Sequence, residues 1–162
     1  MTMSRQPGVS RETILHVRDH CLCLHAQRAA RALARRFDEA FRPLGLTNGQ
    51  FSLMMSLNRA EPPAMGRVAA FLAMDRTTLT AALKPLVRRG LVDVVCSPSD
   101  GRSRVMTLTA SGRAALAQAL PIWTQAHAEI ERLFAAGEAD SLRTFLDALS
   151  RLPAGNTDDA LK

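Results

Sequence analysis

The chain contains no tyrosine and one tryptophan, and only 4% of its 162 residues are aromatic. The core of a domain this size must therefore be built from Leu, Ala, Val, Met and Phe. The three cysteines, Cys21, Cys23 and Cys96, are an odd number in so long a chain, which excludes a disulfide framework. No apolar run approaches the roughly 20 residues of a membrane span, and the polar N-terminus lacks a signal-peptide core. We expect a soluble protein of the cytoplasm.

The sequence also lacks the motifs that mark common classes of enzyme. It has no phosphate-binding loop, no nucleophile elbow and no pair of carboxylates at a plausible site. We therefore expect a protein that is not an enzyme and that needs no cofactor.

Positive charge, in contrast, is abundant. The net charge is +6, and 19 of the 21 basic residues are arginine, the others being Lys84 and Lys162. Arginine suits phosphate recognition because its planar guanidinium donates two hydrogen bonds at once. A basic balance alone also fits an acidic membrane surface or an acidic partner, so the positions of the arginines must decide.

Apolar residues recur at three- and four-residue steps over residues 10–44, which predicts one long helix with an apolar stripe. The stripe consists of Leu22, Ala26, Ala29, Leu33, Phe37, Ala40 and Leu44. A second helical section follows Thr109, with a kink expected at Pro121 and a last helix after Gly137. One small core cannot cover these stripes, so residues 10–44 and 110–152 are predicted to form a helical dimerisation region. Residues 153–162 are predicted to be a flexible tail.

Residues 45–109 show a different pattern. Thr47 and Gln50 have the spacing of a capping box, which starts a helix that runs to about Arg59. A short helix is predicted over 64–72 and a third over 75–89, capped by Asp75 and ended by Gly90. Strands are expected over 91–96 and 104–109, joined by a turn-rich loop. The fold class is therefore mainly α with a small β-hairpin wing (α+β): a winged helix-turn-helix between N- and C-terminal dimerisation helices.

In such a module the third helix enters the major groove of DNA. Leu79, Leu83 and Leu86 would form its buried side. The opposite side offers small and basic residues suited to base edges and phosphates: Arg76, Thr77, Thr78, Thr80, Ala81, Lys84 and Arg88. An ordinary amphipathic surface helix has a similar pattern, but the adjacent hairpin independently favours DNA binding.

The hairpin supplies two further basic residues. Arg102 stands where the wing tip would reach an adjacent minor groove, and narrow A·T-rich grooves attract arginine. Arg104 is a second candidate for DNA contact. It is also the expected partner of Asp100, unless another nearby arginine takes that place.

Three segments resemble the multiple-antibiotic-resistance regulator (MarR) family of winged-helix regulators. They are LAMDRTTLTAALKPLVRRGLV from Leu72, DGRSRVMTLTASG from Asp100, and LGLTNGQF from Leu44. Their order and spacing match the family. The resemblance implies a homodimer, a pseudo-palindromic operator, and repression that a small molecule or an oxidant relieves.

Two departures from the family pattern affect the DNA contacts. Lys84-Pro85 stands where the family often has an acid and an arginine, and Pro85 is expected to bend the last turn of the helix. Gly101 occupies a wing position where a second arginine is common.

A constitutive architectural DNA-binding protein without an effector is the alternative function.

The expected effector site is a cavity between the long first helix, the second helix and the kinked fifth helix. Its candidate residues are apolar walls and polar anchors for an anionic, possibly aromatic, ligand: His25, Arg28, Phe51, Met54, Met55 and Trp123. Met and aromatic residues at helical spacing are also the usual composition of a plain core.

Cys23 is the redox candidate. It falls where the peroxide-sensing branch of the family places its reactive cysteine, but Gln27 and Phe37 stand at the positions of that branch's supporting tyrosines. Cys21 would lie on another face of an intact helix. We therefore expect a small-molecule signal, with thiol-based peroxide sensing at Cys23 as the alternative.

The same helix also carries residues that can bind a metal ion. His16, His20 and Cys23 share one helical face and, with a fourth ligand such as His127, have zinc-ligand chemistry. The favoured interpretation is that both histidines are exposed near the dimer interface, and no metal site is predicted.

Overall fold

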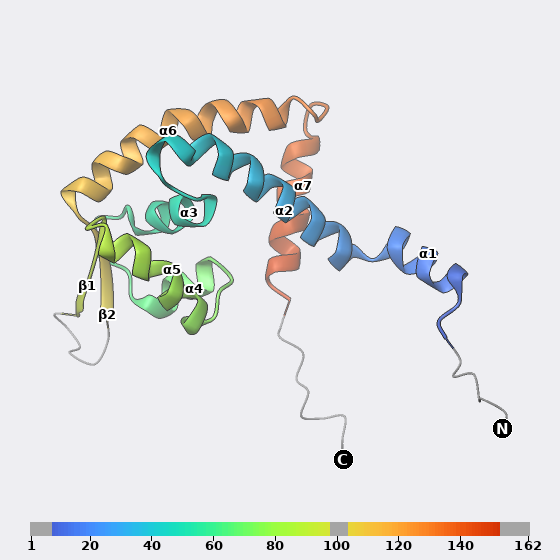
Figure 1. Cartoon of the computed structure of the whole chain (residues 1–162), viewed down its shortest axis with the longest axis horizontal. Coiled ribbons are helices and arrows are strands. Elements are labelled where there is room, and N and C mark those ends of the chain that lie inside the picture. The colour runs from blue at the N-terminus through green and yellow to red at the C-terminus, as the bar shows by residue number, and fades with distance from the viewer. Residues whose placement is uncertain (1–7, 98–103, 153–162) are drawn as a thin grey trace, which may run out of the picture.

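A computed structural model describes residues 8–97 and 104–152 of the chain and shows a mostly helical protein with one small sheet (Figure 1). In order, the elements are α1 (Arg11–His20), α2 (Leu22–Phe41), a 3-10 turn η1 (Arg42–Leu44), α3 (Asn48–Leu57), α4 (Met65–Phe71), α5 (Arg76–Arg88), β1 (Val92–Cys96), β2 (Arg104–Leu108), α6 (Ala110–Glu131) and α7 (Glu138–Ser150). This order confirms the predicted fold class.

The elements fall into two groups. Helices α3, α4 and α5 and the β1–β2 hairpin gather at one end of the molecule, while α6 lies alongside α2 and covers α3 (Figure 1). Helices α1 and α7 extend away from this body. Within the described residues, no helix is both long enough and apolar enough to cross a membrane.

The helix starts follow the predicted caps. Thr47 accepts a hydrogen bond from the backbone N–H of Gln50, whose side chain accepts one from the N–H of Thr47, so the capping box is complete. Asp75 caps α5 and Thr109 caps α6 through side-chain oxygens. These caps satisfy N–H groups that the helices leave without a partner.

The core lies where the two groups meet. Phe41 at the end of α2 stacks on Phe51 of α3 with ring centroids 4.7 Å apart, and both side chains are buried. Leu79 of α5 and Met106 of β2 are fully buried in the same cluster. Helices α3, α4 and α5 and the hairpin therefore share one continuous core with helices α2 and α6.

The expected single helix over residues 10–44 is wrong. Cys21, with ψ 104, is not helical and separates α1 from α2. Its N–H donates to the carbonyl of Val17, and its sulfur accepts the N–H of Leu24 at 3.4 Å. The first is still a helical bond, whereas the second replaces a backbone bond by a side-chain bond, a competition that the apolar periodicity does not reveal.

Neither of the two prolines inside helices ends its helix. Helix α6 continues through Pro121 from Ala110 to Glu131, and α5 continues through Pro85 to Arg88. The prolines each remove one backbone donor, and the kink at Pro121 and the bend at Pro85 stay predictions.

Large apolar side chains are exposed on the outer helices. On α1 and α7 they are Ile14, Leu15, Val17, Leu142, Phe145, Leu146 and Leu149. Both helices have no buried residue within the described chain. Exposed apolar helix faces of this kind are typical of a protein interface.

Candidate nucleic-acid interface

Helix α5 begins at a charged cap. The Asp75 carboxylate accepts the backbone N–H of Thr78 at 2.7 Å and the Thr78 hydroxyl at 3.0 Å. These hydrogen bonds lower the pKa of Asp75 below its ordinary value. The carboxylate is therefore held at the positive end of the helix dipole, where it stabilises the first turn.

The two sides of α5 differ as the sequence predicts. Leu79, Leu83 and Leu86 are buried in the core, and α5 as a whole contacts α3, α4 and β1. Each candidate DNA-contacting residue of the helix is exposed: Arg76, Thr77, Thr78, Thr80, Ala81, Lys84 and Arg88. The exposed side thus combines short side chains with cations, which suits close approach to a duplex.

One of the threonines is tied to the helix itself. The Thr80 hydroxyl donates to the carbonyl of Arg76 at 2.7 Å. Its proton is therefore engaged, and its remaining lone pairs can accept from a base amino group. In a complex with DNA, the Thr80 hydroxyl is therefore better placed to accept a hydrogen bond than to donate one.

The wing is an antiparallel pair. Val92 faces Leu108 at its base and Cys96 faces Arg104 at its outer end. Arg104 is exposed. Arg102, Asp100 and Gly101 lie outside the described residues, so the structure places neither the wing-tip contact nor the expected Asp100–Arg104 pair.

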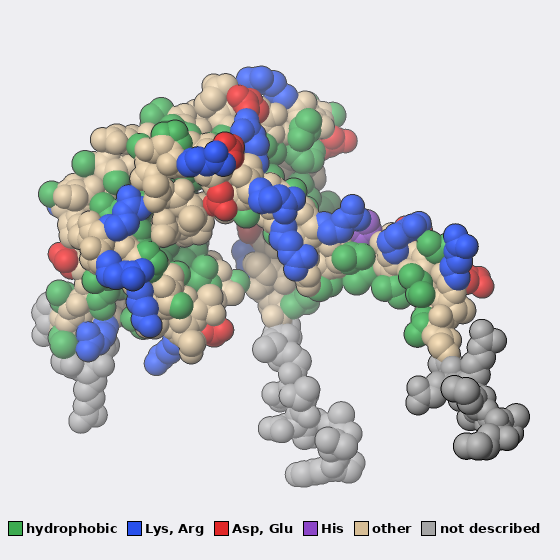
Figure 2. Space-filling model, in the orientation of Figure 1, with side chains coloured by type: hydrophobic (Ala, Val, Ile, Leu, Met, Phe, Trp, Pro, Cys, Tyr) green, Lys and Arg blue, Asp and Glu red, His purple; other side chains and the backbone are tan. Residues whose placement is uncertain are grey.

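A groove of about 590 Å³ separates α5 from the wing. Leu83, Val87 and Val94 contribute apolar surface, and Lys84, Arg88 and Arg104 contribute cations. Figure 2 shows Lys and Arg side chains over this winged-helix end and along α1 and α2. Lys84, Arg88 and Arg104 therefore form a cluster of positive charge beside the exposed side of α5.

The predicted effector residues lie in different surroundings in the described part of the chain. Phe51 and Met54 are buried in the core, and Trp123 stacks between Phe51 and His127. Met55 and Arg28 are exposed. His25 reaches back across the helix break, with Nε2 3.3 Å from the carbonyl of Asp19.

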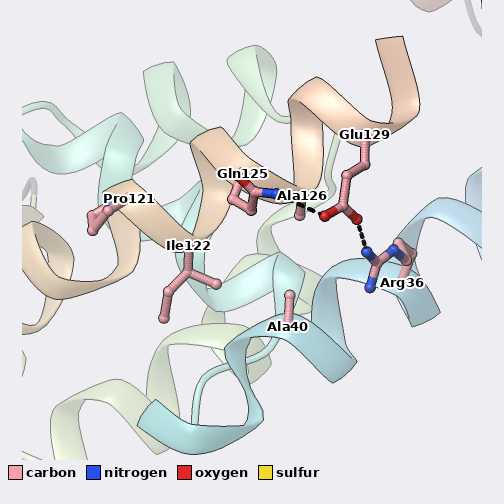
Figure 3. Close-up of a pocket in the computed structure, with 7 residues that line it drawn as sticks. All are labelled: Arg36, Ala40, Pro121, Ile122, Gln125, Ala126 and Glu129. Carbon is pink, nitrogen blue, oxygen red and sulfur yellow. Dashed lines mark hydrogen bonds and ion pairs between the residues drawn. The ribbon is translucent and has the colours of Figure 1, made fainter. Parts of the chain in front are cut away.

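A cavity of about 380 Å³ lies instead between α2 and α6 (Figure 3). Ala40, Pro121 and Ile122 supply apolar lining. At its polar end Arg36 pairs with Glu129, which also accepts from Gln125 Nε2 at 2.9 Å. Hydrogen bonds from Gln125 and Arg36 lower the pKa of Glu129.

Sequence reasoning missed these polar residues. The step of four between Gln125 and Glu129 places both on one face of α6, which is a usable signal. Nothing local indicates Arg36, because its partner lies 93 residues away in the chain.

The sulfur and imidazole groups gather around the helix break. The side-chain N–H of Gln27 donates to Cys23 Sγ at 3.1 Å. His16 stacks on His20 at 4.3 Å, and His20 Nδ1 lies 2.9 Å from the His16 carbonyl. In the part of the chain that the structure describes, no three His, Cys, Asp or Glu residues form a group that could hold a metal ion.

The fold and the exposed basic side of α5 define a winged helix-turn-helix protein. Residues 44–103 match the model of the MarR family. The chain is similar to the M. tuberculosis transcriptional regulator MosR in complex with DNA, with 38% identity and a TM-score of 0.73 over 81% of this chain and 94% of that one. The chain belongs to the MarR family of DNA-binding transcriptional regulators.

Two further relatives are informative. The repressor CouR bound to a DNA duplex matches with 29% identity and a TM-score of 0.73, over 83% of this chain and 96% of that one. CouR from Rhodococcus jostii has also been solved with p-coumaroyl-CoA; that structure matches at 22% identity and TM-score 0.72, over 85% and 96% of the chains, and shows the fold alone.

The transcriptional activatory protein BadR of Rhodopseudomonas palustris is 38% identical over 72 residues. These are 43% of this chain and 41% of BadR, so the chain matches less than half of that relative.

Proposed function

We propose that this chain is a homodimeric repressor rather than an enzyme. It places α5 of each subunit in the major groove at one half of a pseudo-palindromic operator. The main support is that every candidate contact residue on α5 is exposed and lies beside the cations of the groove between α5 and the wing. Short side chains at Thr77 and Ala81 let the backbone approach base edges, while Arg76, Lys84 and Arg88 meet bases or phosphates. Arg102 and Arg104 extend this contact to the minor groove.

The exposed apolar faces of α1 and α7 support the dimer. Val17 is 52% exposed and Phe145 is 65% exposed in the single chain. Burying such side chains between two copies is favourable at about 25 cal/mol per Å² of apolar surface. Residues 10–44 and 110–152 thus form the proposed dimerisation region, and residues 45–109 the DNA-binding domain.

The test uses a duplex selected on the wild-type protein from a random-sequence library. Arg76→Ala and Lys84→Ala should each weaken binding, by roughly 1–3 kcal/mol for a base contact, or lower the salt slope by about one for a phosphate contact. Arg132→Ala on α6 is the charge-matched control, since Arg132 caps the end of α6 away from α5. Two variants that titrate like the wild type would overturn the recognition-helix assignment.

The proposed effector is a small anionic aromatic compound, and the α2–α6 cavity is its candidate site. A carboxylate that enters must compete with Glu129 for Arg36 (Figure 3). Glu129→Gln should therefore tighten the binding of aromatic carboxylates, and Arg36→Met should weaken it.

Trp123, the chain's single tryptophan, is adjacent to Ile122 of the cavity and gives a fluorescence signal for the titration. The matching neutral amides serve as controls. Unchanged operator binding in the presence of every aromatic carboxylate tested would favour the constitutive architectural protein.

A second candidate, thiol-based peroxide sensing, is favoured by two observations. An amide N–H of Gln27 already donates to Cys23 Sγ, in place of the absent tyrosine hydroxyls. Cys21 stands between α1 and α2, so an intact helix does not hold it away from Cys23.

The chemistry of this candidate balances with an organic hydroperoxide as the oxidant. Cys23 is oxidised to a sulfenic acid with release of an alcohol. The Cys21 thiol then displaces water to form a disulfide.

A further inference from the structure

Arg89, the residue at the C-terminal cap of α5, reaches across to a distant turn. Its guanidinium donates through Nη1 to the carbonyl of Gly45 at 2.5 Å and through Nη2 to the carbonyl of Leu44 at 3.1 Å. These carbonyls lie 44 and 45 residues earlier in the chain. Both belong to the turn that ends the outer helix α2 and its extension η1.

The turn is suited to receive a cation. Carbonyls at the end of a helix have no partner within it and carry the negative end of the helix dipole. Gly45 has φ 62, a left-handed conformation that favours glycine, and a Cβ there would lie 3.7 Å from Arg89 Nη2. The guanidinium therefore lies close over Gly45 and provides a cap for α2 that comes from another element.

The chain after Arg89 is equally constrained. Gly90 N–H bonds to the carbonyl of Val87 and Leu91 N–H to that of Leu86, which completes a Schellman motif. The Thr109 hydroxyl donates to the carbonyl of Gly90 at 2.7 Å. The end of the recognition helix is thus tied to α2 through Arg89 and to the start of α6 through Thr109.

We infer that Arg89 is a positioning residue for DNA recognition: it fixes α5 relative to α2 and thereby sets the half-site spacing that the dimer accepts. This inference rests on the proposed function, in which α2 belongs to the dimerisation region and α5 binds the operator. Arg88, one residue earlier, lines the wing groove. The two neighbouring arginines therefore have different roles, one toward DNA and one toward the protein.

The first experiment separates these roles by salt dependence. Each phosphate contact contributes roughly 0.9 to the slope of log K against log salt. Arg88→Met should lower the slope by about one, the value expected for a lost phosphate contact. Arg89→Met should weaken binding roughly tenfold, which corresponds to about 1.4 kcal/mol, and leave the slope unchanged. Arg42→Met, which removes only an exposed pair with Glu39, should change neither quantity.

The second experiment measures spacing. Duplexes selected on the wild-type protein are lengthened or shortened by one base pair between the half-sites. The wild type and Arg88→Met should discriminate strongly against both changes, whereas Arg89→Met should discriminate less. Arg89→Lys keeps the charge but lacks the planar fork, so it should behave like Arg89→Met. Rescue of affinity and slope by lysine would instead identify a phosphate contact and overturn the inference.

A third measurement needs no DNA. Spin labels are placed on cysteines at positions Arg35 of α2 and Ala81 of α5, both exposed, in a chain whose own cysteines are serine. Labelled protein is diluted with unlabelled protein, so that distances within one chain are measured. Arg89→Met should broaden the distance distribution, and an unchanged distribution would overturn the inference. If the wild type selects no duplex, the proposed function fails, and this measurement still decides the role of Arg89.

Discussion

The carbonyl oxygen of Leu91 occupies the space where a side chain on Gly112 would begin. A Cβ at position 112 would lie 2.0 Å from that oxygen and 3.0 Å from the Leu91 carbonyl carbon. The start of α6 therefore packs directly on the backbone that follows α5, at the junction where Thr109 also makes hydrogen bonds to Gly90 and Leu91.

This contact predicts the effect of one methyl group. Gly112→Ala should destabilise the fold by about 1–3 kcal/mol, because backbone on both sides must move to admit the Cβ. Gly49→Ala is the matched control, since Gly49 lies in α3 and its Cβ would meet nothing within 4 Å. Chemical denaturation measures both, and equal midpoints for the two variants would contradict the prediction.

The cap of α5 predicts a pH dependence. Hydrogen bonds from Thr78 lower the pKa of Asp75 from an ordinary value of 3.8. A carboxyl with a depressed folded-state pKa stabilises the fold above its unfolded pKa, and this contribution is lost as pH falls through the folded value. Asp75→Asn, which keeps a capping side chain without the charge, should therefore melt below the wild type at pH 7.

The difference should shrink as the pH falls below about 3.8, where the wild-type carboxyl also becomes neutral. Asp93→Asn, an exposed carboxylate in β1 that caps no helix, controls for net charge. Thermal melts by circular dichroism give the comparison. A constant difference across this pH range would show that the charge of Asp75 plays no part.

The exposed apolar faces predict the oligomeric state. The chain should sediment as a dimer at micromolar concentration, because Phe145 and its neighbours on α7 remain uncovered in one copy. Phe145→Glu together with Val17→Glu should shift the protein toward monomer. Operator binding should weaken, because each half-site would then be bound by a separate monomer. A wild-type monomer at this concentration would contradict both the dimer and the pseudo-palindrome.

The cysteines allow a test that distinguishes an aromatic carboxylate from a peroxide as the signal. Cys23→Ser should keep operator binding, because the side chain is exposed on α2, away from α5. If an aromatic carboxylate is the signal, cumene hydroperoxide should leave wild-type binding unchanged in a gel-shift titration. Release of the wild type by low peroxide, reversed by thiol and absent in Cys23→Ser and Cys21→Ser, would establish the sensor instead.

Much of the fold follows from short-range patterns. The caps at Thr47, Asp75 and Thr109, the stop at Gly90 and the two strands all depend on residues within a few positions of one another. Hydrogen bonds at helix ends and the alternation of buried positions are local properties, so the sequence alone predicts the order of elements and the exposed side of α5.

The tertiary structure decided what local pattern leaves open. The helix break at Cys21 depends on a competition between helical and local side-chain bonds that periodicity does not register. Whether Phe51 and Trp123 are core or cavity wall depends on which helix covers them. The contacts of Arg89 with Gly45, Arg36 with Glu129 and Gly112 with Leu91 join segments far apart in the chain. Such contacts form only when packing fixes the distance between elements, so they cannot be predicted from the spacing of residues in the sequence.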